Sequence, residues 1–260
     1  MRFELAVEQG GCWSPWTASA TLGPHRFPSL ATQHGSLRSE VDVFFASEPA
    51  ERVRMRLALH SDEVRLLDTV PWLATLSASD LAQVPDSDDV AGGRAVIDVP
   101  ACSQMEEPES LRHRICSPTS VAMVLGRWGV HAAPRVLAAD VFDAQLDLYG
   151  VWPAAIRAGA RRGIGGYLLR FPDWQAARWC LGAGLPVVAS VRYARGELSG
   201  AAIEETSGHL IVLTGFDGAE VLVNDPAAPT RAEVPRRYTL DQLRRVWLER
   251  SGVGYVFFRP

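Results

Sequence analysis

Lysine is absent from this chain of 260 residues, and all 26 basic residues are arginine. Without a lysine amine the protein cannot form a Schiff base, hold a pyridoxal cofactor through lysine, or build the usual phosphate-binding loop. Cysteine is scarce as well: only Cys12, Cys102, Cys116 and Cys180 occur, and none of them has the paired spacing of a zinc site. A structural zinc site built on cysteines is therefore not expected.

Long apolar runs are also missing. No segment approaches the length of a membrane span, and the first residues alternate like a strand instead of forming the apolar core of a signal peptide. The net charge of -4 gives no indication of nucleic-acid binding, whereas the hydrophobic content of 47% is enough for a buried core. As written, the sequence predicts a cytoplasmic protein with no membrane span and no nucleic-acid partner.

Residues 1–95 are predicted to form an N-terminal β domain. Four segments alternate apolar and polar residues, as half-buried strands do, and turn-forming residues separate them; the segments are 3–7, 17–22, 39–45 and 53–59. This pattern predicts a small, antiparallel, sandwich-like domain. The acidic and turn-rich stretch 83–93 is the expected linker.

Residues 96–260 are predicted to form a second domain, in which helices come first and a sheet follows. We expect helices at 134–142, 153–162, 173–182 and 239–247, and strands at 167–171, 186–193, 209–216, 219–224 and 253–258. Trp174 and Trp179 are the expected apolar anchors of the third of these helices. Asp217-Gly218 predicts a hairpin between two of the strands, because both residues tolerate positive φ. The resulting fold class is α+β.

A further helix is predicted within the stretch 111–129, starting just after Cys116. Ser117 is the expected cap, Pro118 suits the first helical position, and Gly129 ends the run. Since 121–125 is entirely apolar, this helix should lie inside the domain. A thiol at a helix N-terminus is favoured as thiolate, which makes Cys116 a candidate nucleophile, although a lone cysteine beside an apolar helix is also a common core residue.

A cysteine nucleophile needs a base, and the base needs a third group to orient it. His209 opens a strand that leads into the Asp217-Gly218 hairpin, and the returning strand ends next to Asp225, so the hairpin brings the two side chains together. His113 is a weaker candidate base, because Arg112 and Arg114 flank it. The other histidines are expected at the surface or in loops: His25, His34, His60 and His131.

These residues and their order resemble the papain-like cysteine peptidases of family 39, which include the bacteriocin-leader-processing peptidases. The matching segments are Val99–Gln104, Cys116–Leu125 with Trp128-Gly129, Gly208–Phe216 and Val223–Pro226. The resemblance covers residues 96–260 and implies a papain-like fold. It also implies a peptide or protein substrate and no metal or organic cofactor.

The resemblance assigns four roles. Cys116 would be the nucleophile, His209 the general base and then acid, and Asp225 the group that orients His209. Gln104, twelve residues before Cys116, stands in the place of the glutamine that stabilises the oxyanion. Ser117 departs from the pattern, because the family usually has glycine directly after the nucleophile.

The function expected from these residues is hydrolysis of a peptide or amide bond through an acyl-enzyme on Cys116. Two alternatives stay open at this point: a binding module that keeps the fold without turnover, and an acyl transferase that uses an amine acceptor. The segment Cys12–Trp16 weakly resembles N-terminal modules that precede such peptidase-like domains, and this resemblance says little about a ligand. In the binding-module alternative, the β domain would bind a wall polymer or a partner protein. Relatives are often exported, which contrasts with the absence of an export signal here.

Overall fold

The structure is a computed structural model that describes residues 1–63, 65, 68, 73–80 and 92–260. The chain divides into two compact units, of which the first comprises Met1–Leu76 with Asp143–Val151 and the second Ser77–Phe142 with Trp152–Pro260. The linker expected at 83–93 lies outside the described residues except for its last two glycines. The domain boundary between residues 95 and 96 stays a prediction. Among the helices described, none is both long and apolar enough to cross a membrane.

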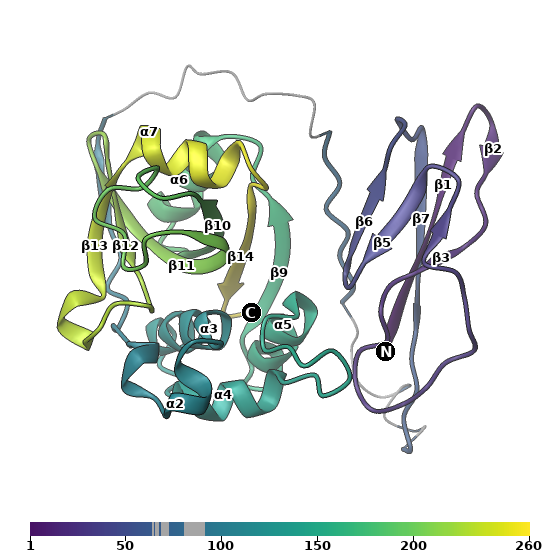
Figure 1. Cartoon of the computed structure of the whole chain (residues 1–260), viewed down its shortest axis with the longest axis horizontal. Helices are drawn as coiled ribbons and strands as arrows, with labels where there is room; N and C mark the ends of the chain where they lie inside the picture. The colour runs from purple at the N-terminus through teal and green to yellow at the C-terminus, as the bar shows by residue number, and fades with distance from the viewer. Residues whose placement is uncertain (64, 66–67, 69–72, 81–91) are drawn as a thin grey trace. The chain divides into compact units, whose positions relative to one another are not determined.

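The first unit contains two antiparallel sheets (Figure 1). In the larger sheet, β1 pairs with β7 over nearly its whole length and with the short strands β2 and β3. The smaller sheet has the order β4-β5-β6. The strands are β1 (Arg2–Gln9), β2 (Cys12–Trp13), β3 (Thr17–Ala18), β4 (Gln33–His34), β5 (Leu37–Glu40), β6 (Val43–Ala46) and β7 (Arg52–Ala58).

One small apolar cluster includes residues from both of these sheets. Leu5 and Val7 lie two positions apart on β1 and therefore point to the same face, where they are buried with Leu37 of β5. Phe44 of β6 and Met55 of β7 pack against them. The two sheets thus share a core, although it is a small one.

Two strand predictions in this unit are wrong in extent. Segment 39–45 is the turn and flanking residues of a hairpin, since β5 ends at Glu40, β6 begins at Val43, and the two residues pair with each other. Val41 in the turn has a φ of 53°, a conformation in which glycine or asparagine is more usual, so the sequence carries no ordinary turn signal there. The strand expected at 17–22 is confined to Thr17–Ala18.

A seven-stranded antiparallel sheet is the centre of the second unit. The order is β13-β12-β11-β10-β14-β9, and β8 pairs with one end of β11. All five predicted strands are present, whereas β8 and β13 were not predicted. The strands are β8 (Arg94–Val96), β9 (Gly165–Arg170), β10 (Val187–Tyr193), β11 (Thr206–Asp217), β12 (Glu220–Asn224), β13 (Pro235–Thr239) and β14 (Val253–Phe258).

Helices α3, α4 and α5 lie together along one side of this sheet in Figure 1. The α+β class is confirmed, and all of the predicted helices form. They are α3 (Cys116–Arg127), α4 (Pro134–Val141), α5 (Trp152–Ala160), α6 (Trp174–Gly182) and α7 (Leu240–Leu243), which continues into the π-helical turn η3 (Arg244–Leu248). The short elements α2 (Glu109–Arg112), η1 (Gln104–Glu106) and η2 (Arg231–Glu233) complete this unit.

Helix α3 is the buried helix that the sequence predicts. Residues 121–125 are at most 4% exposed, the helix packs against β11, and Gly129 follows its end with a φ of 75°. Its start differs from the prediction, because Cys116 is already the first helical residue and the capping position is Ile115. Ser117 is therefore not the cap; its buried hydroxyl has no hydrogen-bond partner in the structure. Pro118 still lies in the first turn, where its missing N–H costs nothing.

Of the two tryptophans expected to anchor α6, only one does so. Trp174 is 2% exposed and lies edge-on to Phe216 of β11, whereas Trp179 is 69% exposed. A helix of nine residues buries one stripe only, and the two tryptophans are five positions apart, which places them on different faces. The prediction for Trp179 is therefore wrong.

Candidate active site

Four separate segments of the second unit carry the candidate site residues. Cys116 is the first residue of α3, His209 lies near the start of β11, and Asp225 follows directly after β12. Gln104 is the first residue of η1. The hairpin β11-β12 pairs Val212 with Asn224, and this register sets His209 and Asp225 at the same end of the two strands.

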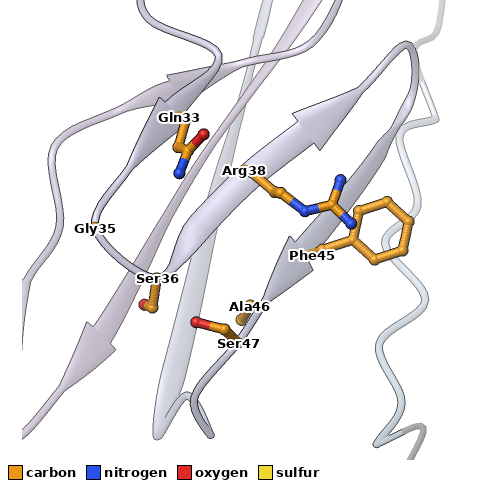
Figure 2. Close-up of a pocket in the computed structure, with 7 residues that line it drawn as sticks. All are labelled: Gln33, Gly35, Ser36, Arg38, Phe45, Ala46 and Ser47. Carbon is orange, nitrogen blue, oxygen red and sulfur yellow. The ribbon is translucent and has the colours of Figure 1, made fainter.

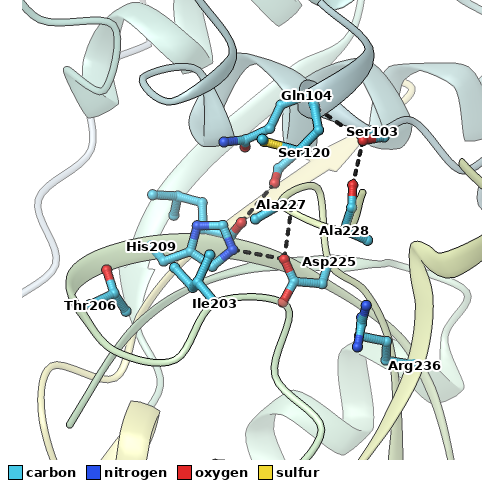
Figure 3. Close-up of polar contacts among 12 residues, drawn as sticks. Ser103, Gln104, Ser120, Ile203, Thr206, His209, Asp225, Ala227, Ala228 and Arg236 are labelled. Carbon is cyan, nitrogen blue, oxygen red and sulfur yellow. Dashed lines mark hydrogen bonds and ion pairs between the residues drawn. The ribbon is translucent and has the colours of Figure 1, made fainter. Parts of the chain in front are cut away.

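His209 and Asp225 form a buried pair. The ring Nε2 of His209 lies 2.8 Å from Oδ1 of Asp225, and the two residues are 3% and 0% exposed (Figure 3). The other ring nitrogen, Nδ1, does not contact Asp225, and His209 lies close enough to the thiol of Cys116 for each group to shift the pKa of the other. Cys116 as a whole residue is partly buried. The structure thus places the Cys116 thiol next to a histidine that is hydrogen-bonded to a carboxylate.

The electrostatics of these three residues favour a charged thiolate and a charged imidazolium. Burial raises the pKa of the Cys116 thiol, but the hydrogen bond and positive charge of His209 lower it by more, together with the backbone N–H groups of Leu210 and Ser117. Burial lowers the pKa of His209, but the hydrogen bonds and negative charges of Asp225 and Cys116 outweigh it and raise that pKa to about 10. At neutral pH the proton therefore resides on the imidazole ring.

Asp225 is held by more than the histidine. Its Oδ1 also accepts the backbone N–H of Ala227 at 3.0 Å, and its Oδ2 accepts the hydroxyl of Tyr238 at 3.0 Å. Burial raises the pKa of Asp225, but the hydrogen bonds and charge of His209, followed by these two donors, bring it below its ordinary value. The carboxylate is therefore ionised, and both of its oxygens are fixed.

Tyr238 is the site residue that the sequence reading missed. It lies on β13, opposite Val221 of β12, and is 1% exposed. The burial of the ring, followed by the negative charge of Asp225, raises the pKa of Tyr238, so its hydroxyl stays protonated and acts as a donor. Proline and two adjacent arginines begin this short strand and hide its alternation, which is why neither β13 nor the tyrosine stands out in the sequence.

Gln104 is tied to the loop that carries Asp225. Its backbone N–H donates to the carbonyl oxygen of Pro226 at 2.8 Å, and the Nδ2 group of Asn224 donates to the carbonyl of Val99 at 3.1 Å. The side-chain Nε2 of Gln104 donates one N–H to the carbonyl of Arg112 at 2.7 Å. A second N–H on that nitrogen remains for another acceptor. Gln104 is 5% exposed and lies in the same view as His209 and Asp225 in Figure 3.

The remaining histidines and cysteines do not join this group of residues. The side chain of His113 is 62% exposed and lies 3.8 Å from Glu109, so the weaker candidate base faces solvent. All four cysteines are free, and burial raises the pKa of Cys102 and of Cys180, in contrast to that of Cys116.

Two surface hollows lie away from these residues. The one in the first unit, of about 330 Å³, is shown in Figure 2 and is lined by Gln33, Gly35, Ser36, Arg38, Phe45, Ala46 and Ser47. The guanidinium of Arg38 lies over the ring of Phe45 there, 4.2 Å from its centre. The other, in the second unit, has about 660 Å³ and includes Cys102 and Glu107 in its lining. Neither of these two hollows is lined by Cys116, His209 or Asp225.

Comparison with known proteins gives a consistent assignment of the second unit. The model of the Peptidase_C39 like family matches residues 96–255, which is more than half of the chain. No match is found among curated proteins.

Solved structures of similar fold have low sequence identity. A putative C39-like peptidase from Bacillus anthracis is 16% identical, with a TM-score of 0.50, and the match covers 65% of this chain and 99% of that one. The peptidase domain of Streptococcus ComA, a bifunctional ABC transporter of a quorum-sensing pathway, is 12% identical over 63% and 100% of the two chains, with a TM-score of 0.47. A double-glycine motif protease from an AMS/PCAT transporter, solved with its leader peptide, is 18% identical over 64% and 95%, with a TM-score of 0.45. The first of these likenesses supports the papain-like fold.

Proposed function

Since the chain belongs to the Peptidase_C39 like family, we propose that it is a thiol hydrolase that cleaves a peptide or amide bond through an acyl-enzyme on Cys116. The observation that carries this proposal is the buried, hydrogen-bonded pair His209–Asp225 next to Cys116, with which His209 interacts electrostatically. A cysteine with a structural role only would need neither the histidine nor the carboxylate. The proposal assigns each of these groups a step in the reaction.

In the first half-reaction, the Cys116 thiolate attacks the carbonyl carbon of the scissile bond and forms a tetrahedral oxyanion. The His209 imidazolium then gives its proton to the departing nitrogen as the C–N bond breaks, which leaves a thioester on Cys116 and releases an amine. Asp225 keeps the ring oriented and stabilises its positive charge while the proton is still bound.

In the second half-reaction, neutral His209 takes a proton from water as the oxygen attacks the thioester carbon. The carboxylic acid product leaves, and the proton on His209 restores the imidazolium beside the regenerated thiolate. An amine in place of water would give a transfer product by the same route. The four groups are compatible with both acceptors, and water is the acceptor present in excess.

Gln104 is proposed to stabilise the oxyanion with the N–H that Arg112 does not use. The backbone N–H of Cys116, at the start of α3, is the expected second donor. Removing one such donor costs about 3 kcal/mol of transition-state stabilisation in well-studied acyl-transfer enzymes. Because the Gln104 backbone is fastened to Pro226, this donor is positioned by the same loop that holds Asp225.

The test is a cleavage assay on a synthetic peptide library, with new amino termini identified by mass spectrometry. Wild type should give discrete cleavage products, and Cys116→Ala should give none. Cys102→Ala is the matched control, because Cys102 is also a partly buried cysteine of the second unit but lies outside this group of residues. This variant should keep the wild-type products.

A peptide aldehyde or vinyl sulfone should also form an adduct with wild type at Cys116, visible in the intact mass. Adduct formation at Cys116 without any cleaved peptide in a broad library would favour the acyl transferase, which is then tested with added amines. Absence of both adduct and products would contradict the proposal and leave a binding module of the same fold.

A further inference from the structure

Three metal-ligand side chains meet at one end of the larger sheet in the first unit. His25 belongs to the loop after β3, and His60 and Asp62 follow the end of β7. The loop before His25 is tied to the start of β1, since Leu22 and Met1 exchange backbone hydrogen bonds. Arg2 of β1 pairs with Ala58 at the end of β7, so the two segments are brought to the same place.

The ligand atoms of the three side chains lie close together. The Nε2 atoms of His25 and His60 lie 3.7 Å and 3.9 Å from the two carboxylate oxygens of Asp62. The imidazole rings are parallel, with an interplanar angle of 3° and centroids 4.2 Å apart. One ligand atom from each residue falls within 4.8 Å of the other two. These separations are too long for hydrogen bonds, so the three ligand atoms lie near one another without being hydrogen-bonded to one another.

We propose that His25, His60 and Asp62 bind a divalent transition metal ion of the zinc type. Zinc binds histidine nitrogen and carboxylate oxygen at about 2.0–2.2 Å, so ligand atoms around a tetrahedral ion are about 3.3 Å apart. Rotation of the exposed side chains would bring the three atoms to that separation, and it must tilt at least one imidazole out of the parallel stack so that both ring nitrogens point at the ion. Two imidazoles and one carboxylate form a common ligand set for this ion, and water would supply the fourth ligand.

The site is open to solvent, because the side chains of His25, His60 and Asp62 are 33%, 48% and 84% exposed. An ion can therefore enter without any movement of the backbone. Once bound, it would link the loop after β3 to the end of β7, two segments that are far apart in sequence. The proposed role is consequently to stabilise the first unit, independently of the chemistry at Cys116.

The test is isothermal titration of Zn²⁺ into the full chain in a Cys116→Ala background, which removes the reactive thiol as a competing ligand. We expect one ion per chain, with affinity at least tenfold weaker in His25→Ala, in His60→Ala and in Asp62→Asn. His34→Ala is the matched control, because His34 lies on β4 of the same unit, outside the cluster, and should bind as the background does.

A second readout is the melting temperature of the full chain, which Zn²⁺ should raise in the background and in His34→Ala but not in Asp62→Asn. Asp62 is largely exposed, so its replacement should leave the fold intact. Equal affinity and equal thermal shift in all of these variants would overturn the proposal, as would the absence of any zinc binding by the background chain.

Discussion

Each unit buries a carboxylate and pairs it across neighbouring strands, but the partners differ. In the first unit, Glu4 of β1 is 2% exposed and accepts hydrogen bonds from Arg2 and Arg56. In the second unit, Asp225 is fully buried and is bonded to His209 and Tyr238. Both carboxylates have a pKa below the ordinary value, because in each case the partners' hydrogen bonds and charge outweigh the opposing effect of burial.

The difference lies in whether the partner can release its proton. An arginine stays protonated at any pH the protein tolerates, so the pair at Glu4 can only hold strands together. A histidine can give up its proton, and the one beside Asp225 also lies next to a thiol. The neighbours of Glu4 also fit a structural role. The guanidinium groups of Arg54 and Arg56 lie over the rings of Trp13 and Trp16, respectively, on the outside of the first unit. Similar buried carboxylates thus have a structural role in one unit and a proposed catalytic role in the other.

Removing the Cys116 thiol should have the largest effect on activity and should separate the catalytic role from the structural one. Cys116→Ala is expected to reduce peptide cleavage by at least about a thousandfold, because losing a nucleophile removes the covalent route and leaves only binding and oxyanion stabilisation. The melting temperature should change little. Steady-state rates measured beside Cys102→Ala provide the check, and substantial cleavage by the alanine variant would mean that the mechanism is wrong.

Removing the charge from each carboxylate is the next test. Asp225→Asn keeps an acceptor for His209 but loses the negative charge that raises the pKa of the ring, so we expect kcat/KM to fall by about 100-fold at neutral pH. Glu4→Gln makes the same change in the first unit and should leave kcat/KM unchanged. Equal losses of kcat/KM in Asp225→Asn and Glu4→Gln would contradict the assignment of a catalytic role to Asp225 and a structural role to Glu4.

The effect of Glu4→Gln should appear in stability instead of activity. Glu4→Gln weakens the contacts to Arg2 and Arg56 and should lower the free energy of unfolding by about 1–2 kcal/mol at pH 7. The folded pKa of Glu4 is lowered, so its contribution is present above the unfolded pKa and is lost as pH falls through the folded pKa. Denaturant unfolding from pH 7 to pH 3 should show the free energies of unfolding of wild type and Glu4→Gln converging in acid. A difference between them that stays constant with pH would argue against an ionised Glu4.

The smallest effect is expected at Tyr238. Tyr238→Phe removes one donor to Asp225 and should lower kcat by only a few-fold, since His209 and the N–H of Ala227 still hold the carboxylate. Tyr193→Phe is the control, because that hydroxyl donates to the carbonyl of Ile203 instead. A merely structural tyrosine would lower stability without moving the pH profile of kcat/KM, whereas a positioning role predicts a shift in that profile.

The sequence predicts the parts of this fold that are regular and long. The buried helix after Cys116, the hairpin at Asp217-Gly218 and the strands of the central sheet carry strong periodic patterns, because the burial of one face or of the whole element determines the residue choice. Their packing brings His209 beside Asp225. The family resemblance adds Gln104, which on its own has no distinguishing signal.

What the sequence could not predict depends on contacts between distant or irregular segments. Tyr238 reaches Asp225 only because β13 pairs with β12, and β13 itself has a weak pattern. The proposed metal ligands His25 and His60 are far apart in the chain and meet through the pairing of β1 with β7. The start of α3 was misjudged for a local reason, since Ser117 is a good capping residue by type but lies inside the first turn.

The most direct test of the account is the rate at which iodoacetamide alkylates Cys116 from pH 4 to pH 9, followed by peptide mass spectrometry. Wild-type Cys116 should already react quickly near pH 6, because its pKa is lowered by His209, while Cys102 in the same sample should stay slow. In His209→Ala, the Cys116 rate should fall at pH 6 and follow an ordinary thiol with a pKa of about 8.5. The same ordinary profile in wild type would contradict the thiolate–imidazolium pair and, with it, the proposed hydrolase.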